Sequence, residues 1–199
     1  MKMKGNKTII LASGSPRRKE LLAGLDIEFE TDTRNRFKED YSIDTPHRRI
    51  PALMSEGKSY GFHRPLAPDE ILITADTLVL CGNEVLGKPK GEDDTQKAAD
   101  AARMLRILSG REHEVITAVT IRDNSRHKTF SDIAEVRFRE LTDDEIGYYI
   151  ERYRPFDKAG AYGIQEWIGY VGIDCIKGSF YTIMGLPVHL LYRHLQDFM

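Results

Sequence analysis

The chain has 199 residues, of which 41% are hydrophobic and 30% are charged. That balance is typical of a globular domain, and the length is enough to bury a full core. Lysine and arginine (29) almost balance aspartate and glutamate (31), which argues against binding nucleic acid through bulk positive charge. No apolar run approaches the length of a membrane span, so we expect a cytoplasmic protein, without a membrane partner, forming one domain over residues 1–199.

The first elements along the chain are a buried strand and a helix. Residues 8–12 form a short apolar, β-branched run, which is typical of a buried strand. A helix is predicted to begin at Pro16 with Ser15 as its N-cap, because proline suits the first helical position and serine caps it. Residues 34–70 are rich in charge and proline, and one short helix, from Pro51 to Gly61, is expected within them.

The middle of the chain predicts a central strand, a long helix and two further strands. Residues 71–80 are almost entirely apolar and predict the central strand. Alanine and leucine at helical spacing over residues 95–108 predict the helix. Residues 115–121 and 133–138 predict strands, and residues 142–145 form a capping box that starts another helix.

Near the C-terminus, residues 171–176 and 180–184 predict two strands, and Pro187 opens a last helix. Strands and helices alternate early and are mixed later, so the fold class is α/β, with a mixed central β-sheet flanked by helices. Cys81 and Cys175 each lie in an apolar stretch, and we expect both to be buried free thiols.

The segment from Ser13 to Arg18 joins the first strand to the first helix and is the first candidate site. A helix start is the positive end of the helix dipole, so Arg17, Arg18 and Lys19 oppose it by roughly 0.3–1 kcal/mol each. A bound phosphate explains this arrangement, since Ser13 and Gly14 allow close backbone approach and Arg17 can donate two parallel bonds. The alternative is that these side chains extend into solvent or meet acidic residues elsewhere.

Asp76 is the second candidate, because a carboxylate inside an apolar strand is costly to bury unless it is paired. It is interpreted as a general base or as a ligand for a hard divalent cation, the alternative being a strand-end residue that caps a turn. Lys58, Lys88 and Lys158 form a third set. Any one of them is more often a solvated surface charge, but together with Asp76 they are consistent with a polyphosphate clamp.

These segments in order resemble the Maf family of nucleoside triphosphate pyrophosphatases. The resemblance runs from about residue 8 to residue 190, and its motifs are specific only in combination. The matching pieces are Leu11 to Arg18, Ala75 to Thr77, Gly87 to Pro89, Leu108 to His113, Asp157 to Gln165, and Gly178-Ser179 followed by Gly185 to Pro187.

The resemblance implies hydrolysis of a nucleoside triphosphate between the α and β phosphates, with Mg²⁺ or Mn²⁺, in two lobes around a deep cleft (a Maf/ITPase-like fold). It implies that Asp76 is catalytic and binds the metal. By the same resemblance, the substrate-binding residues are Ser13, Arg17, Arg18, Lys58, Thr77, Lys88, Lys158 and Gln165.

Two stretches depart from the family pattern. The family's acidic motif corresponds here to residues 37–41, so Glu39 is the matching second metal ligand, with Lys38 in place of the usual acidic neighbour. The usual Lys-Ala pair is Lys58-Ser59. The intact run from Ala159 to Gln165 resembles the subgroup that prefers dTTP and UTP, with modified pyrimidine nucleotides as a further substrate class.

A rival hypothesis from another class is a regulator of cell division or septum formation that binds nucleotides without hydrolysing them. The enzyme predicts stoichiometric release of pyrophosphate, whereas the regulator predicts binding without product. A homodimer is compatible with the sequence, which does not determine the oligomeric state.

Overall fold

The computed structural model describes residues 7–199, so the first six residues of the predicted domain lie outside the described part of the chain. The strands are β1 (Thr8–Leu11), β2 (Glu30–Thr31), β3 (Glu70–Cys81), β4 (Glu84–Leu86), β5 (Glu112–Arg122), β6 (His127–Phe138) and β7 (Ile173–Lys177). The α-helices are α1 (Pro16–Ala23), α2 (Ile50–Tyr60), α3 (Asp94–Leu108), α4 (Asp143–Tyr153), α5 (Trp167–Gly172), α6 (Phe180–Met184) and α7 (Val188–Leu195).

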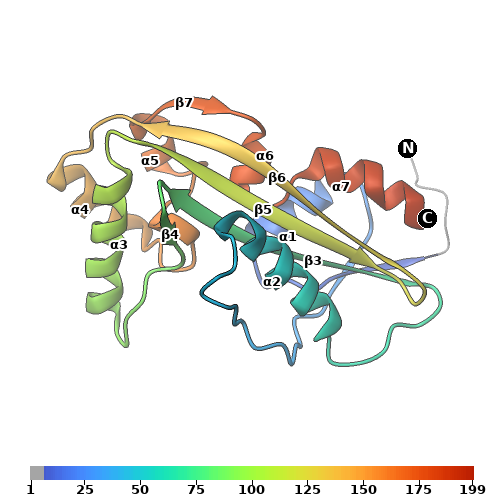
Figure 1. Ribbon diagram of the computed structural model, residues 1–199. Coiled ribbons are helices and arrows are strands. Elements are labelled where there is room, and N and C mark those ends of the chain that lie inside the picture. The colour runs from blue at the N-terminus through green and yellow to red at the C-terminus, as the bar shows by residue number, and fades with distance from the viewer. Residues whose placement is uncertain (1–6) are drawn as a thin grey trace. The chain divides into compact units, whose positions relative to one another are not determined.

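The strands of the described residues form one seven-stranded sheet in the order β2-β1-β3-β5-β6-β7, with β4 paired to β3. Strand β1 runs parallel to β2 and β3, whereas β4 runs antiparallel to β3 and β7 antiparallel to β6. Strands β5 and β6 lie side by side as the long yellow-green and yellow hairpin in Figure 1. The prediction of a mixed sheet in an α/β fold is confirmed.

The described chain divides into two compact units. One contains residues 7–77, 117–132 and 185–199, and the other contains residues 78–116 and 133–184. The division passes through β3 between Thr77 and Leu78. The single-domain organisation and the deep cleft stay predictions.

Strand β3 is central in the sheet, as predicted, and its burial follows from that place. The run from Ile71 to Ala75 is buried, and burial resumes at Leu78. Only Asp76 and Thr77 interrupt the strand's otherwise buried interior with partly exposed side chains. Two polar side chains, those of Asp76 and Thr77, therefore lie within an apolar strand. Burying such side chains costs free energy unless they have hydrogen-bond or ion-pair partners.

The helix ends follow the sequence signals closely. Ser15 caps α1, and its hydroxyl accepts a hydrogen bond from the Arg18 backbone N–H. Helix α4 begins with a complete capping box between Thr142 and Glu145. Pro187 is the N-cap of α7, whose buried face includes Leu191 and Leu195. Among the described residues, no helix is both long and apolar enough to cross a bilayer.

Of the two strands predicted near the C-terminus, the first is confirmed apart from its start and the second is wrong. Residues 180–184 form helix α6 instead of a strand, and β7 begins only at Ile173, after helix α5. The chain leaves β7 at Gly178, whose φ of 108° belongs to the left-handed region. The Thr182 N–H then donates to the Ser179 carbonyl oxygen at 3.1 Å, which closes a helical turn.

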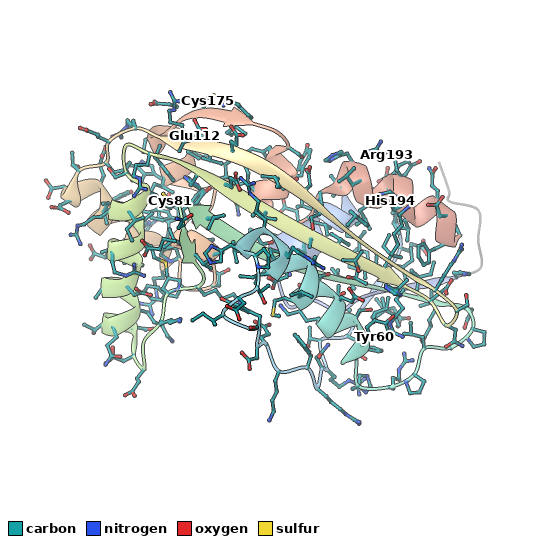
Figure 2. The ribbon with its side chains drawn as sticks, viewed as in Figure 1. Tyr60, Cys81, Glu112, Cys175, Arg193 and His194 are labelled. Carbon is teal, nitrogen blue, oxygen red and sulfur yellow. The ribbon has the colours of Figure 1, made fainter. Side chains whose placement is uncertain are left out.

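The expected burial of Cys175 is also wrong. Cys175 is exposed, whereas Cys81 is buried, and both are free thiols. Figure 2 shows Cys175 on β7, which is the last strand of the sheet, and Cys81 lies at the end of β3. An edge strand is covered less than a central one, so an apolar stretch there does not ensure burial.

Candidate active site

The loop between β1 and α1 is arranged around two serines. Ser13 is buried, and its hydroxyl accepts hydrogen bonds from the Ser15 N–H at 3.3 Å and from Arg18 Nη1 at 3.4 Å. Gly14 is exposed, and a Cβ placed there would have Thr33 Cγ2, at 3.9 Å, as its nearest neighbour. The first turn of α1 has no acidic residue, so the positive end of its dipole is not offset from within the helix.

Arg18 joins this loop to β3 and to the segment before α7. Its Nε donates to the Gly185 carbonyl oxygen at 2.9 Å, and its Nη1 donates to that of Ala75 at 2.9 Å. Its Nη2 donates to Thr77 Oγ1 at 3.0 Å, and Thr77 Oγ1 also bonds to Thr117 Oγ1 at 3.0 Å. With the Ser13 bond, four of the five guanidinium N–H groups serve the protein. Arg18 thus holds the Ala75 carbonyl oxygen and the Thr77 hydroxyl, which flank Asp76 in the chain.

Asp76 and Glu39 are held by one ammonium group. Lys58 Nζ lies 2.7 Å from Asp76 Oδ1 and 2.8 Å from Glu39 Oε1. The side chain of Asp76 is 18% exposed and that of Glu39 is 62% exposed, so the first carboxylate is largely buried and the second is not. Helix α2 carries Lys58 and β3 carries Asp76, which brings together two residues that the sequence could only propose separately.

Burial raises the pKa of the Asp76 carboxyl above its ordinary value, and the positive charges of Lys58 and Arg18 oppose that rise. Burial likewise lowers the pKa of the Arg18 guanidinium, and Asp76 opposes that shift. The two side chains are therefore electrostatic partners without a direct hydrogen bond between them. Ser13, Arg18, Lys58, Asp76 and Thr77 thus belong to one connected arrangement within the first unit.

The second unit holds three of the expected substrate-binding residues, and Arg17 lies half-buried on α1 in the first unit. Lys88 is exposed after β4. Lys158 is only 8% exposed and forms ion pairs with Asp157 and Glu166. Gln165 is half-buried, and its Oε1 is a buried oxygen that accepts no hydrogen bond from the described residues.

The contacts of Glu166 in the second unit were not predicted from the sequence. Glu166 binds Lys158 through one carboxylate oxygen and accepts a hydrogen bond from the Tyr149 hydroxyl through the other. Tyr149 is buried on α4, and Glu166 was assigned no role from the sequence. An acidic residue directly after a glycine-rich segment was the only available signal.

No group of three or more His, Cys, Asp or Glu side chains within residues 7–199 is arranged to hold a metal ion.

The comparisons with known proteins cover almost all of the chain. The family model described as "Maf-like protein" matches residues 8–198. A protein of Porphyromonas gingivalis named "dTTP/UTP pyrophosphatase" is 48% identical over 192 residues, covering 96% of this chain and 94% of the relative. A protein of Bacteroides thetaiotaomicron with the same name is 46% identical over 188 residues, covering 94% of each chain.

A solved structure supports the fold assignment. The Staphylococcus aureus Ham1 protein matches with a TM-score of 0.50 and 14% identity, covering 97% of this chain and all of the other. At that identity the likeness concerns the fold alone. The family model and the two relatives establish the family resemblance that the motifs indicated, and this chain belongs to the Maf family.

Proposed function

We propose that this protein hydrolyses dTTP and UTP to the nucleoside monophosphate and pyrophosphate. The two relatives carry this activity in their names and match the chain over nearly its whole length. The observation that carries the proposal is the largely buried Asp76 carboxylate, which Lys58 holds beside a second carboxylate, Glu39. This arrangement combines a base, carboxylate oxygens for a cation and a positive charge for phosphate.

In the proposed reaction, a water oxygen bonds to the α-phosphorus while the bond to the oxygen bridging the α and β phosphates breaks. The electron pair of that bond leaves with pyrophosphate. Asp76 accepts the proton of the attacking water, and its raised pKa makes it a stronger base than an exposed aspartate. The side chains of Arg17 and Lys58 are suited to hold the phosphate oxygens and the charge that develops on them.

A divalent cation fits the oxygen donors of the first unit. Glu39 and Asp76 each place a carboxylate oxygen within 2.8 Å of the Lys58 ammonium nitrogen, so the two carboxylates already converge on one positive charge. Mg²⁺ and Mn²⁺ prefer such ligands together with phosphate oxygens and water. Glu39 and Asp76 would hold the ion, which when bound would neutralise phosphate charge.

Gln165 is proposed to recognise the base of the nucleotide. A buried amide oxygen without a hydrogen-bond donor costs free energy in the free protein and gains a bond when a donor arrives. Uracil and thymine carry an N–H between two carbonyl oxygens, and an amide can match such an edge because it both donates and accepts. Lys88 and Lys158 are proposed to bind the phosphates of the same substrate.

A panel of nucleoside triphosphates, including modified pyrimidine nucleotides, tests the proposal. With Mg²⁺ or Mn²⁺ present, we expect pyrophosphate and not orthophosphate as the product, with dTTP and UTP preferred. Nucleotide binding without any product would instead favour the non-hydrolytic regulator. A sizing experiment on the same sample tests the homodimer, and the cytoplasmic location also stays a prediction.

Asp76→Asn is the sharpest single substitution. It keeps the shape of the side chain but removes the base and a cation ligand, so we expect turnover to fall by at least about a thousandfold. The fold should survive, because a neutral amide is less costly to bury than a carboxylate. Asp69→Asn, at an exposed position just before β3, is the matched control and should keep normal turnover. Near-normal turnover in Asp76→Asn would show that Asp76 has no catalytic role.

A further inference from the structure

The ammonium group of Lys158 is placed by a chain of contacts that runs into helix α4. Lys158 Nζ lies 2.9 Å from Asp157 Oδ1 and 2.9 Å from Glu166 Oε1. The lysine side chain is 9% exposed, that of Glu166 is 19% exposed and that of Asp157 is 54% exposed. Water therefore screens the contact with Asp157 more than the contact with Glu166.

The carboxylate of Glu166 is fixed at both of its oxygens. While Oε1 binds Lys158, Oε2 accepts a hydrogen bond from the Tyr149 hydroxyl. Tyr149 is fully buried on α4, and its hydroxyl also accepts a hydrogen bond from the Gly163 N–H at 2.9 Å. Its ring stacks on that of Tyr153, with centroids 5.1 Å apart. Both oxygens of the carboxylate thus have a partner, Lys158 on one side and a buried hydroxyl of α4 on the other.

Two further features show that the backbone is shaped for this carboxylate. Glu166 occupies the N-cap position of α5, but its side chain makes no capping hydrogen bond. An ordinary acidic N-cap would accept from the first turn of its helix, whereas this side chain turns back to Lys158. A Cβ at Gly163 would lie 2.7 Å from Glu166 Cδ, so only glycine leaves room for the carboxylate where it lies.

An ammonium group has three N–H bonds, and in the described residues two of those of Lys158 are directed at Asp157 and Glu166. One N–H is left to meet an outside acceptor. The two acceptors together set the direction of that remaining N–H.

We propose that Glu166, held by Tyr149, is the positioning residue that directs the third N–H of Lys158 at a phosphate oxygen of the substrate. This inference rests on the proposed function, in which Lys158 binds the substrate. Glu166 acts through Lys158 and does not touch the substrate itself.

The test compares Glu166→Gln with Glu151→Gln, which removes an exposed carboxylate from α4. We expect kcat/KM for UTP to fall roughly tenfold to a hundredfold in Glu166→Gln, the usual scale for a misplaced binding group, and to stay normal in Glu151→Gln. Gly163→Ala is a second variant, which displaces the carboxylate without removing a charge. In a Lys158→Met background, Glu166→Gln should cause no further loss.

A spectroscopic measurement separates positioning from simple stability. The ammonium ¹H–¹⁵N signal of Lys158 should be seen in the wild-type protein and in Glu151→Gln, because a fixed ion pair slows proton exchange, and it should be lost in Glu166→Gln. An unchanged signal in Glu166→Gln, or an equal activity loss with and without Lys158, overturns the proposal. If wild-type protein releases no pyrophosphate, the proposed function fails, while the ammonium signal still decides whether Glu166 positions Lys158.

Discussion

His113 should make the stability of the protein fall in mildly acidic solution. It lies on β5 at 2% exposure, with Nε2 2.8 Å from the Tyr162 hydroxyl and its ring stacked on Phe138. Its Nδ1 is buried and has no partner in the described residues. Burial lowers the pKa of the imidazole from 6.5 to about 3, so the folded protein keeps it neutral.

The magnitude follows from the protons bound by the folded and unfolded chains. Between the two pKa values the unfolded chain binds a proton at His113 that the folded chain does not, so stability is lost as the pH falls below 6.5. Between about pH 7 and about pH 5, this one group removes on the order of 2 kcal/mol from the free energy of unfolding.

The assay is urea unfolding of the wild-type protein and of His113→Gln at a series of pH values. Glutamine does not titrate and keeps a hydrogen-bonding group near Tyr162, so every other ionisable group is common to both proteins. The variant should be less stable at neutral pH, because packing against Phe138 is lost, but its stability should fall less steeply towards about pH 5. Parallel pH dependence in the two proteins would refute the assignment of a neutral, buried His113.

Two more substitutions test the packing around the sites. Gly169→Ala should unfold the second unit or cost at least about 3 kcal/mol, because a Cβ there would lie 1.8 Å from the Ile164 carbonyl oxygen, which belongs to the backbone. Its control, Gly147→Ala on α4, meets nothing within 4 Å and should raise the free energy of unfolding by about 0.5–1 kcal/mol, so thermal melting of both variants checks the contrast. Arg18→Lys should cost about 3 kcal/mol and lower kcat for dTTP, because lysine cannot span the four acceptors of the guanidinium; an unchanged melting temperature would contradict that structural role.

Much of the fold could be predicted because local signals and tertiary structure agree. The apolar run of β3 and the cap at Ser15 each point to the structure that forms, as does the capping box at Thr142. Residues 180–184 failed because a short run of aromatic and β-branched residues suits either a strand or a helix. The turn at Gly178 decides between strand and helix for residues 180–184, and this turn depends on close packing against Ala134 on β6.

The start of β6 shows a second limit. The sequence predicted a strand only over residues 133–138, whereas β6 begins at His127. Its first residues are polar and give no apolar alternation. They pair because Asp123 closes the hairpin, its Oδ1 accepting from the Ser125 and Arg126 N–H groups at 2.9 Å. The pairing of this hairpin thus depends on a turn, and the pattern of hydrophobic residues does not predict that turn.

For the candidate site, the sequence identified residue types but not their partners. Asp76 stood out because a carboxylate in an apolar strand needs a reason. Its pairing with Lys58 depends on how α2 packs, and two of the four bonds of Arg18 depend on backbone carbonyls, which carry no sequence signal. Glu166 was missed for the same reason, since its partner on α4 is 17 positions away in the chain.

The missing side chain at Gly163 has a consequence for how this sequence can change over evolutionary time. The space that a Cβ would occupy is filled by the Glu166 carboxylate, so the two positions are not independent. A lineage that gains alanine at position 163 while Glu166 is present displaces the Glu166 carboxylate from its place beside Lys158. The order in which Glu166 is lost and a side chain is gained at position 163 therefore decides whether that path is open.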